Sequence, residues 1–269
     1  MPDTQTAATP VTPERTPGEQ LDDGPPPDEV LIELRDTYKG FGELQVLKGA
    51  SISVERNTNA VVMGGSGSGK SVLLKQIVQL LTPDDGEVWV KGKRMDQLDG
   101  DELDRVRLSI GYLFQGGALF DSMTVFENMN FFLQRHTDLS EAERKERVEE
   151  TLDWVNLRET QPKMPAELSG GQQKRIGLAR SIVLEPEIML YDEPTTGLDP
   201  VSVRTVSDLI VRLRDERDIT SISITHDLLC AEIIADRVHF LHDGELVEHG
   251  TLDELRASDH PALRNFFGK

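Results

Sequence analysis

Apolar residues along the chain follow two spacings, which separate predicted strands from predicted helices. Alternating or clustered apolar residues, typical of strands, occupy segments 30–36, 50–56, 59–65, 87–95, 109–115, 187–193 and 220–227. Helical spacing characterises segments 71–81, 200–217 and 228–236. Because strands and helices alternate, the sequence predicts an α/β fold in which a largely parallel sheet is covered on both faces.

A stretch of helical pattern interrupts this alternation from about residue 123 to residue 184. Residues 125–134 are amphipathic, and the helix predicted over 140–157 begins with the capping-box spacing Ser140-x-x-Glu143. A third helix is predicted over 170–184. This insertion predicts a helical subdomain at about residues 116–184.

Both ends of the chain differ from the part between them. Residues 1–29 hold half of the fourteen prolines, no aromatic residue and an acidic excess, so we expect a disordered tail there. Residues 30–255 are expected to form the folded domain, and residues 256–269 a short C-terminal extension. The N-terminus has no apolar run of the kind that marks a secretory signal.

The composition of the 269 residues limits the classes of function. A net charge of −19 argues against a nucleic-acid-binding surface, because phosphate backbones are bound by basic stripes. The same charge, with 10 Lys against 19 Arg, fits either a host with a high-salt cytoplasm or an ordinary acidic surface. No apolar run approaches the ~18 residues needed to span a bilayer. The single cysteine, Cys230, is expected to pack in a helix near the active site.

The segment 64–71, GGSGSGKS, matches the pattern Gly-x-x-x-x-Gly-Lys-Ser/Thr. Glycines in such a loop let backbone N–H groups approach phosphate oxygens, and the apolar strand before it and the helix after it supply the required context. We therefore predict a nucleotide site in which Lys70 reaches the β- and γ-phosphates and Ser71 ligates Mg²⁺. The residues predicted to bind nucleotide here are Gly64, Gly65, Ser66, Gly67, Ser68, Gly69, Lys70, Ser71 and Val72.

Two further segments follow this loop: LSGGQ at 168–172 and the apolar–Asp–Glu run IMLYDEP at 188–194. Paired carboxylates at the end of a buried strand are costly unless they are used. The three segments together resemble those of the ATP-binding cassette (ABC) ATPases. The resemblance spans residues 30 to about 255 and implies a P-loop NTPase fold with a RecA-like core, an antiparallel β subdomain and a helical subdomain.

The resemblance also implies roles for residues around the phosphates. Glu193 would be the general base for the attacking water, and Asp192 would hold Mg²⁺ through water. Gln115 would contact Mg²⁺ and water, and His226 would hydrogen-bond the γ-phosphate. The predicted catalytic residues are thus Lys70, Gln115, Glu193 and His226, and the predicted metal ligands are Ser71, Gln115 and Asp192.

In ABC ATPases the LSGGQ segment does not reach ATP on its own chain. The resemblance therefore implies a head-to-tail dimer carrying two ATP, in which this segment caps the γ-phosphate held by a second copy. The residues expected at that contact are Ser169, Gly170, Gly171, Gln172 and, from the loop that crosses to the partner, Asp199. Phe41 is the predicted aromatic for stacking on adenine, with Tyr38 as the alternative.

Segments 114–129 and 260–267 resemble, more narrowly, the ATPase subunit of Mla- and Mce-type bacterial lipid transporters. That resemblance implies a membrane permease, an MCE-domain substrate-binding protein and a peripheral place on the cytoplasmic face of the inner membrane. Leu119, Phe120 and Met123 either line the permease docking groove or belong to the core of the helical subdomain. Two rival functions remain: the ATPase of an amino-acid or other small-solute importer, and a soluble cassette that acts outside transport.

Overall fold

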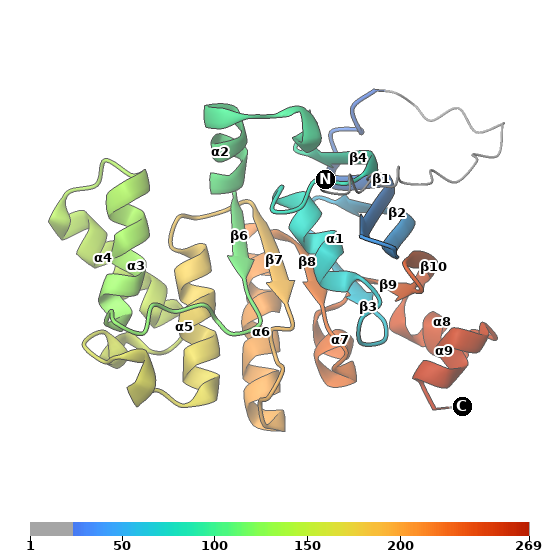
Figure 1. The fold of residues 1–269 in the computed structure, drawn as a ribbon. Coiled ribbons are helices and arrows are strands. Elements are labelled where there is room, and N and C mark those ends of the chain that lie inside the picture. Colours follow the sequence, from blue (N-terminus) through green and yellow to red (C-terminus); the bar gives the residue numbers. More distant parts are fainter. Residues whose placement is uncertain (1–23, 269) are drawn as a thin grey trace, which may run out of the picture.

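Two sheets organise residues 24–268, the part of the chain that the computed structural model describes (Figure 1). The larger sheet has the strand order β10-β9-β3-β8-β7-β6, and all neighbours run parallel except β9 and β10. Its strands are β3 (Asn59–Met63), β6 (Ile110–Leu113), β7 (Ile188–Asp192), β8 (Thr220–Ile224), β9 (Arg237–His242) and β10 (Glu245–Gly250). The predicted, largely parallel sheet is therefore present.

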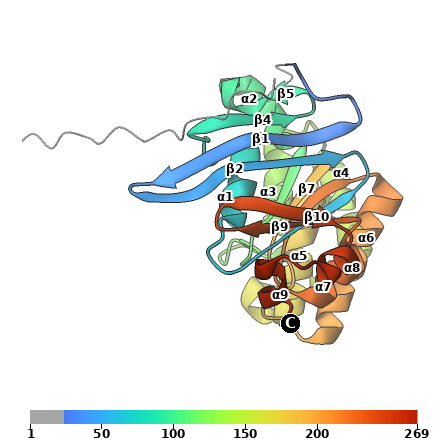
Figure 2. The same cartoon turned by 90° about the vertical axis from the view of Figure 1, so that its right-hand side faces the viewer.

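A smaller, antiparallel sheet has the strand order β2-β1-β4-β5. Its strands are β1 (Val30–Phe41), β2 (Leu44–Glu55), β4 (Asp85–Val90) and β5 (Lys93–Arg94). The hairpin of β1 and β2 extends beyond the body of the molecule (Figure 2). Phe41 and Leu44 at its tip are therefore exposed.

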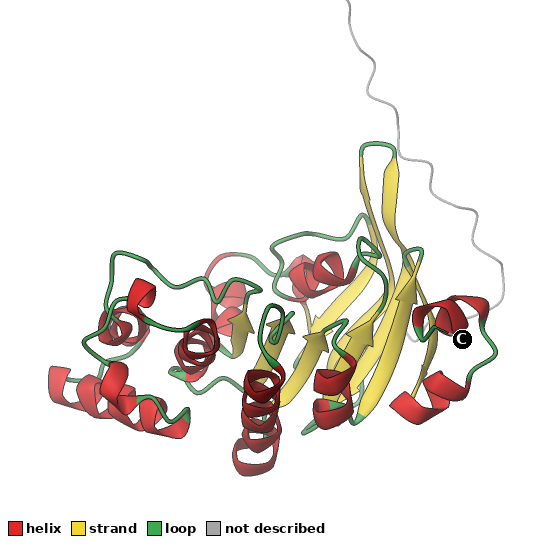
Figure 3. Cartoon of the chain, turned by 90° about the horizontal axis from the view of Figure 1, so that it is seen from below, coloured by secondary structure: helices red, strands yellow, loops and turns green. Residues whose placement is uncertain are grey.

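Helices flank both faces of the larger sheet (Figure 3). The segment predicted to be helical contains α3 (Val125–His136), α4 (Glu141–Trp154) and α5 (Gly170–Ile182). The other α-helices of the described chain are α1 (Lys70–Ile77), α2 (Gly100–Leu108), α6 (Pro200–Arg217), α7 (Leu228–Ile234), α8 (Leu252–Ala257) and α9 (Pro261–Phe266). No helix within residues 24–268 combines the length and the apolar character that a membrane span requires.

Side chains of the parallel strands alternate between two hydrophobic cores, as the period-2 geometry of a strand dictates. On β3, Ala60 and Val62 face the core that contains α1 and the inner face of the smaller sheet. Val61 and Met63 face the opposite core, which contains residues of α5, α6 and α7. Helix α1 thus lies between the two sheets, and this packing fixes the loop that joins β3 to α1.

The described part of the chain begins before the predicted boundary at Val30. Residues 24–29 are described, and they bond to the domain: Nη1 of Arg35 donates to the carbonyl oxygen of Gly24 at 2.8 Å, and the amide of Arg56 donates to Glu29 at 2.7 Å. These bonds join the stretch to β1 and to the residue that follows β2. The boundary between tail and domain stays a prediction. The rest of the predicted tail, residues 1–23, lies outside the described residues.

Candidate active site

The loop between β3 and α1 carries the predicted phosphate-binding residues, and its backbone excludes side chains at two glycines. A Cβ on Gly64 would lie 2.2 Å from the carbonyl oxygen of Leu241, and Gly69 has a φ of +106°. Nζ of Lys70 donates to the carbonyl oxygens of Gly64, at 2.9 Å, and Gly65, at 2.8 Å. Burial lowers the pKa of Lys70, against the opposing effect of Glu193 and Asp192. The loop therefore curls around its own lysine.

Ser71 and Asp192 bring two oxygen ligands together. Asp192 is buried at the end of β7, and Ser71 is the second residue of α1. Oγ of Ser71 donates to Oδ1 of Asp192 over 3.1 Å. Hydroxyl and carboxylate oxygens suit Mg²⁺. The described part of the chain contains no cluster of three or more His, Cys, Asp or Glu side chains that could hold a metal ion.

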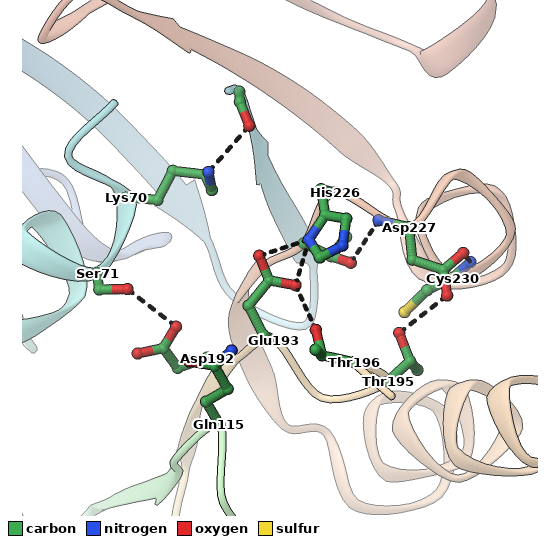
Figure 4. A network of polar contacts seen from close by, with 12 residues as sticks. Lys70, Ser71, Gln115, Asp192, Glu193, Thr195, Thr196, His226, Asp227 and Cys230 are labelled. Atoms are coloured by element: carbon green, nitrogen blue, oxygen red, sulfur yellow. Dashed lines mark hydrogen bonds and ion pairs between the residues drawn. The ribbon is translucent and has the colours of Figure 1, made fainter. Parts of the chain in front are cut away.

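Glu193 adopts a left-handed backbone conformation, with a φ of +53°, that is unfavourable for a residue with a side chain. Its carboxylate has two partners (Figure 4). Nδ1 of His226 lies 2.9 Å from Oε1, and Oγ1 of Thr196 donates to Oε2 over 2.9 Å. These contacts orient a carboxylate at the carboxyl end of the parallel sheet, where α/β proteins commonly bind ligands.

A pocket of about 370 Å³ gathers most of the predicted site. Its lining residues are Val46, Ser66, Gly67, Ser68, Gly69, Lys70, Ser71, Val72, Gln115, Glu193 and His226. The phosphate loop, the end of β6, the end of β7 and the end of β8 thus converge on one space. Sequence reasoning missed Val46, since an apolar residue in a strand gives no sign that it faces a ligand.

A larger recess of about 610 Å³ lies at the opposite edge of the sheet, where β7 and β8 begin. Arg56, Glu187, Arg217 and Asp218 are among its lining residues, so its charges are of both signs. None of the predicted site residues lines it. The predicted site residues thus gather in the smaller pocket and not in this recess.

The predicted γ-phosphate cap lies outside the pocket. Ser169 is the N-cap of α5, and it exchanges capping-box hydrogen bonds with Gln172. Ser169 and Gly170 are exposed, and no residue of 168–172 lines the pocket. Asp199 caps α6, and hydrogen bonds from Ser202 and the amide of Val201 lower its pKa. The capping segment is therefore free to face another molecule.

Phe41, the aromatic predicted to stack on adenine, does not line the pocket. It is 48% exposed at the hairpin tip, with Nζ of Lys39 lying 5.8 Å from the centre of its ring. Tyr38, the alternative, packs against the backbone of Gly49. Stacking by Phe41 stays a prediction.

Side chains of α3 shape the loop that follows Gln115. The buried amide of Asn128, on α3, accepts from the amide of Phe120 at 2.8 Å and donates to the carbonyls of Phe120, Met123 and Thr124. Phe120 is 40% exposed, and its ring lies 5.6 Å from that of Phe131. Leu119 packs on the core, whereas Phe120 presents its ring at the surface.

Sequence comparison assigns the chain to a family. The ABC transporter family matches residues 47–196, which is more than half of the 269 residues. The chain belongs to the ABC transporter family. The predicted ABC ATPase, its P-loop NTPase fold and its ATP-hydrolysing activity are thereby confirmed.

Three curated relatives cover most of this ABC ATPase. It is 41% identical to Protein TRIGALACTOSYLDIACYLGLYCEROL 3, chloroplastic, of Arabidopsis thaliana, over 88% of this chain and 73% of the relative. It is 38% identical to the probable ribonucleotide transport ATP-binding protein mkl of Mycobacterium leprae, over 91% and 70%. It is 36% identical to the intermembrane phospholipid transport system ATP-binding protein MlaF of Escherichia coli K12, over 88% of both chains. The predicted resemblance to the Mla-type ATPase is confirmed.

A solved structure supports the same assignment. The dimeric structure of a post-hydrolysis state of the ATP-binding cassette MJ0796, bound to ADP and Pi, has a TM-score of 0.76 and 33% identity to this ABC ATPase. The similarity covers 82% of this chain and 99% of that one. The chain is thus an ATP-binding ATPase subunit of a transporter.

Proposed function

We propose that this ABC ATPase powers lipid transport, with two copies of the chain enclosing two ATP molecules. The observation that supports the proposal is that the predicted site residues of one chain lie in two separate places. Lys70, Gln115, Glu193 and His226 share one pocket, whereas Ser169 lies on the surface outside it. A pocket that lacks its cap on one side is completed by a second copy, and the cassette MJ0796 has been solved as a dimer.

Each side chain around the pocket has a proposed role that fits its contacts. Lys70 binds the β- and γ-phosphates, and the helix N-terminus at Gly69 favours an anion. Glu193, oriented by Thr196, accepts a proton from the attacking water, and His226 holds the γ-phosphate.

Mg²⁺ fits the oxygen ligands at this edge of the sheet. We assign Ser71, Asp192 and Gln115 to the ion, on the strength of the 3.1 Å contact between Ser71 and Asp192. When bound, Mg²⁺ would neutralise charge on the phosphates. Ser71 and Asp192 are buried or half-buried on rigid elements, so their positions change little when the ion enters.

A second copy would supply its LSGGQ segment to the γ-phosphate. The N-terminus of α5 offers amides at Gly170 and Gly171, and no acidic residue stands in its first turn. Asp199, the N-cap of α6, ends the loop that would cross to the partner. In this arrangement binding of ATP closes the dimer, and hydrolysis with product release reopens it.

Lipid is the cargo that the relatives favour. The name of the Escherichia coli relative states intermembrane phospholipid transport, and the name of the Arabidopsis relative includes a galactolipid. We propose a membrane permease and an MCE-domain protein as partners, with the ATPase on the cytoplasmic face of the inner membrane. The exposed ring of Phe120 is the proposed point of contact with the permease.

Isolation of the native complex tests this function. Tagged chain drawn from native membranes should bring down a multi-span permease, an MCE-domain protein and phospholipid. Phe120→Asp should weaken this association because it places a charge in an apolar contact, whereas Phe120→Leu should preserve it. Both variants should bind ATP as the parent does. Recovery of a small-solute importer or of ribosomes would overturn the lipid function and leave the ATPase assignment standing.

A different cargo is the second candidate. The mycobacterial relative is named for ribonucleotide transport, and it shares 38% identity. The two cargoes can be distinguished by the molecules that remain bound to the purified complex. Nucleoside phosphates other than ATP and ADP in the extract, without phospholipid, would favour the ribonucleotide.

A further inference from the structure

Helix α5 presents a stripe of three residues to the loop that begins at Gln115. Lys174, Gly177 and Arg180 are spaced three apart, so they share one face of the helix. Arg180 donates to the carbonyl oxygens of Gly117 and Ala118. At Gly177 the two backbones approach so closely that an added Cβ would lie 3.1 Å from Cα of Gly117. The helix that starts with the LSGGQ segment is thus fastened to the loop after β6.

Lys174 extends this contact into the catalytic pocket. Its ammonium donates to the carbonyl oxygen of Gln115 and, over 3.1 Å, to the carbonyl oxygen of Glu193. The side chain is 8% exposed, and burial lowers its pKa although Glu193 and Asp192 oppose that effect. A buried lysine requires such hydrogen-bond partners. The ammonium therefore joins three elements: α5, the loop after β6, and the end of β7.

The bond to Glu193 falls on a backbone that needs support. Glu193 has a φ of +53°, and a left-handed residue of this kind persists only where its surroundings enforce it. The amide of Glu193 donates to the carbonyl of Ile224 at 3.0 Å, and its carbonyl accepts from Lys174. One peptide group on each side of its Cα is thus anchored, and the direction of the side chain follows from that geometry.

We propose that Lys174 is a positioning residue for Glu193, which it holds in the left-handed conformation that aims the carboxylate at the pocket. Lys174 touches neither the carboxylate nor the reacting groups in this role; it acts through the backbone of Glu193. Because the same ammonium holds Gln115, movement of α5 shifts the base and the glutamine together. The proposal rests on the proposed role of Glu193 as general base.

Replacement of Lys174 by Met tests the proposal in the full chain with ATP and Mg²⁺. K174M should lower kcat by roughly 10- to 100-fold, because a small misplacement of a catalytic group has effects of that size. The KM for ATP should stay within about threefold, because no phosphate contact is lost. K174R, which keeps donors for both carbonyls, should recover part of kcat. The exposed Lys145 on α4 supplies the matched control, and K145M should leave both constants unchanged.

A double variant separates positioning from general damage to the helix. In an E193Q background, K174M should cause no further loss of kcat, because the residue that Lys174 positions is already inactive. ATP-dependent dimers, measured by size-exclusion chromatography, should persist in K174M. If K174M does not fold, as judged by the lack of a cooperative thermal transition, K174Q replaces it. Because Gln keeps an amide donor, we expect K174Q to lose less kcat than K174M in the parent background and again none in the E193Q background.

Three results would overturn the proposal. These are a parental kcat in K174M, an equal loss of kcat in the parent and E193Q backgrounds, and a tenfold rise in KM with loss of the dimer. The last result would show that Lys174 supports the LSGGQ segment instead. Normal ATPase activity in E193Q alone would refute the proposed role of Glu193, so the two failures are distinguishable.

Discussion

Nδ1 of His226 lies 2.9 and 2.8 Å from the two carboxylate oxygens of Glu193, although 33 residues separate them in the chain. The two residues follow the neighbouring parallel strands β8 and β7. Because an ionised carboxylate only accepts, Nδ1 carries the proton in this contact. The other ring nitrogen, Nε2, is thereby left as the atom that meets an incoming ligand. This one contact therefore orients both side chains.

Replacement of Glu193 by Gln should reduce turnover to a small residual rate and preserve ATP binding. Gln keeps the size of the side chain and its contact with Thr196, but it cannot accept a proton, so we expect at least roughly a 100-fold loss of kcat. Phosphate release and fluorescent-nucleotide titration measure the two properties. An ATP-bound dimer should accumulate. Normal steady-state hydrolysis by the variant would show that another group activates the water.

Gly64 and Gly65 should respond differently to alanine. A Cβ on Gly64 would lie 2.2 Å from a carbonyl oxygen of β9, whereas no atom lies within 4 Å of a Cβ on Gly65. We expect Gly64→Ala to lower the free energy of unfolding by roughly 2 kcal/mol or more, and Gly65→Ala by much less. Urea unfolding without nucleotide measures both. Equal stability of the two variants would mean that the loop relaxes freely.

Stability between pH 4 and 6.5 should depend on His239. Its imidazole is buried on β9, stacked on His249 of β10, and burial, with the nearby His249 and Arg237, lowers its pKa to about 4. In the unfolded chain the pKa returns to about 6.5. The unfolded state therefore binds the proton first as pH falls. The stabilising effect of the neutral ring is complete above pH 6.5 and decreases toward pH 4.

His239→Leu removes this titration. The difference in unfolding free energy between parent and variant should change by about 2 kcal/mol from pH 7.5 to pH 5, in the direction that favours the variant at low pH. Urea unfolding at the two pH values supplies the comparison. A constant difference would show that His239 has an ordinary pKa.

Local signals in the sequence predicted the elements that carry the site. The capping box of Ser140 and Glu143 is present at the start of α4, and Pro200 begins α6 as predicted. Glycines and a lysine at fixed spacing identified the phosphate loop, because the chemistry of phosphate binding dictates those residue types. Such features depend on neighbours within a few residues, so they are readable without the fold.

Other features depend on contacts between distant segments and were not predictable. Helix α2 was missed, since Val106 is its only buried residue and no apolar period marks it. The hydrogen bond from Lys174 to the carbonyl oxygen of Gln115 joins residues 59 positions apart. Nothing near Lys174 in the sequence distinguishes it from a lysine on an exposed helix face. Only the packing of α5 on the loop gives that residue its partners.

The separation of the LSGGQ segment from the pocket has a genetic consequence in the two-copy arrangement that we propose. One composite site needs Lys70 from one chain and Ser169 from the other. A chain impaired only at Lys70 and a chain impaired only at Ser169 would each be inactive alone. A mixed pair of these chains would contain two different sites. One site would have an intact Lys70 from one chain and an intact Ser169 from the other, and the second site would carry both impaired residues. Two alleles without activity would thus complement each other.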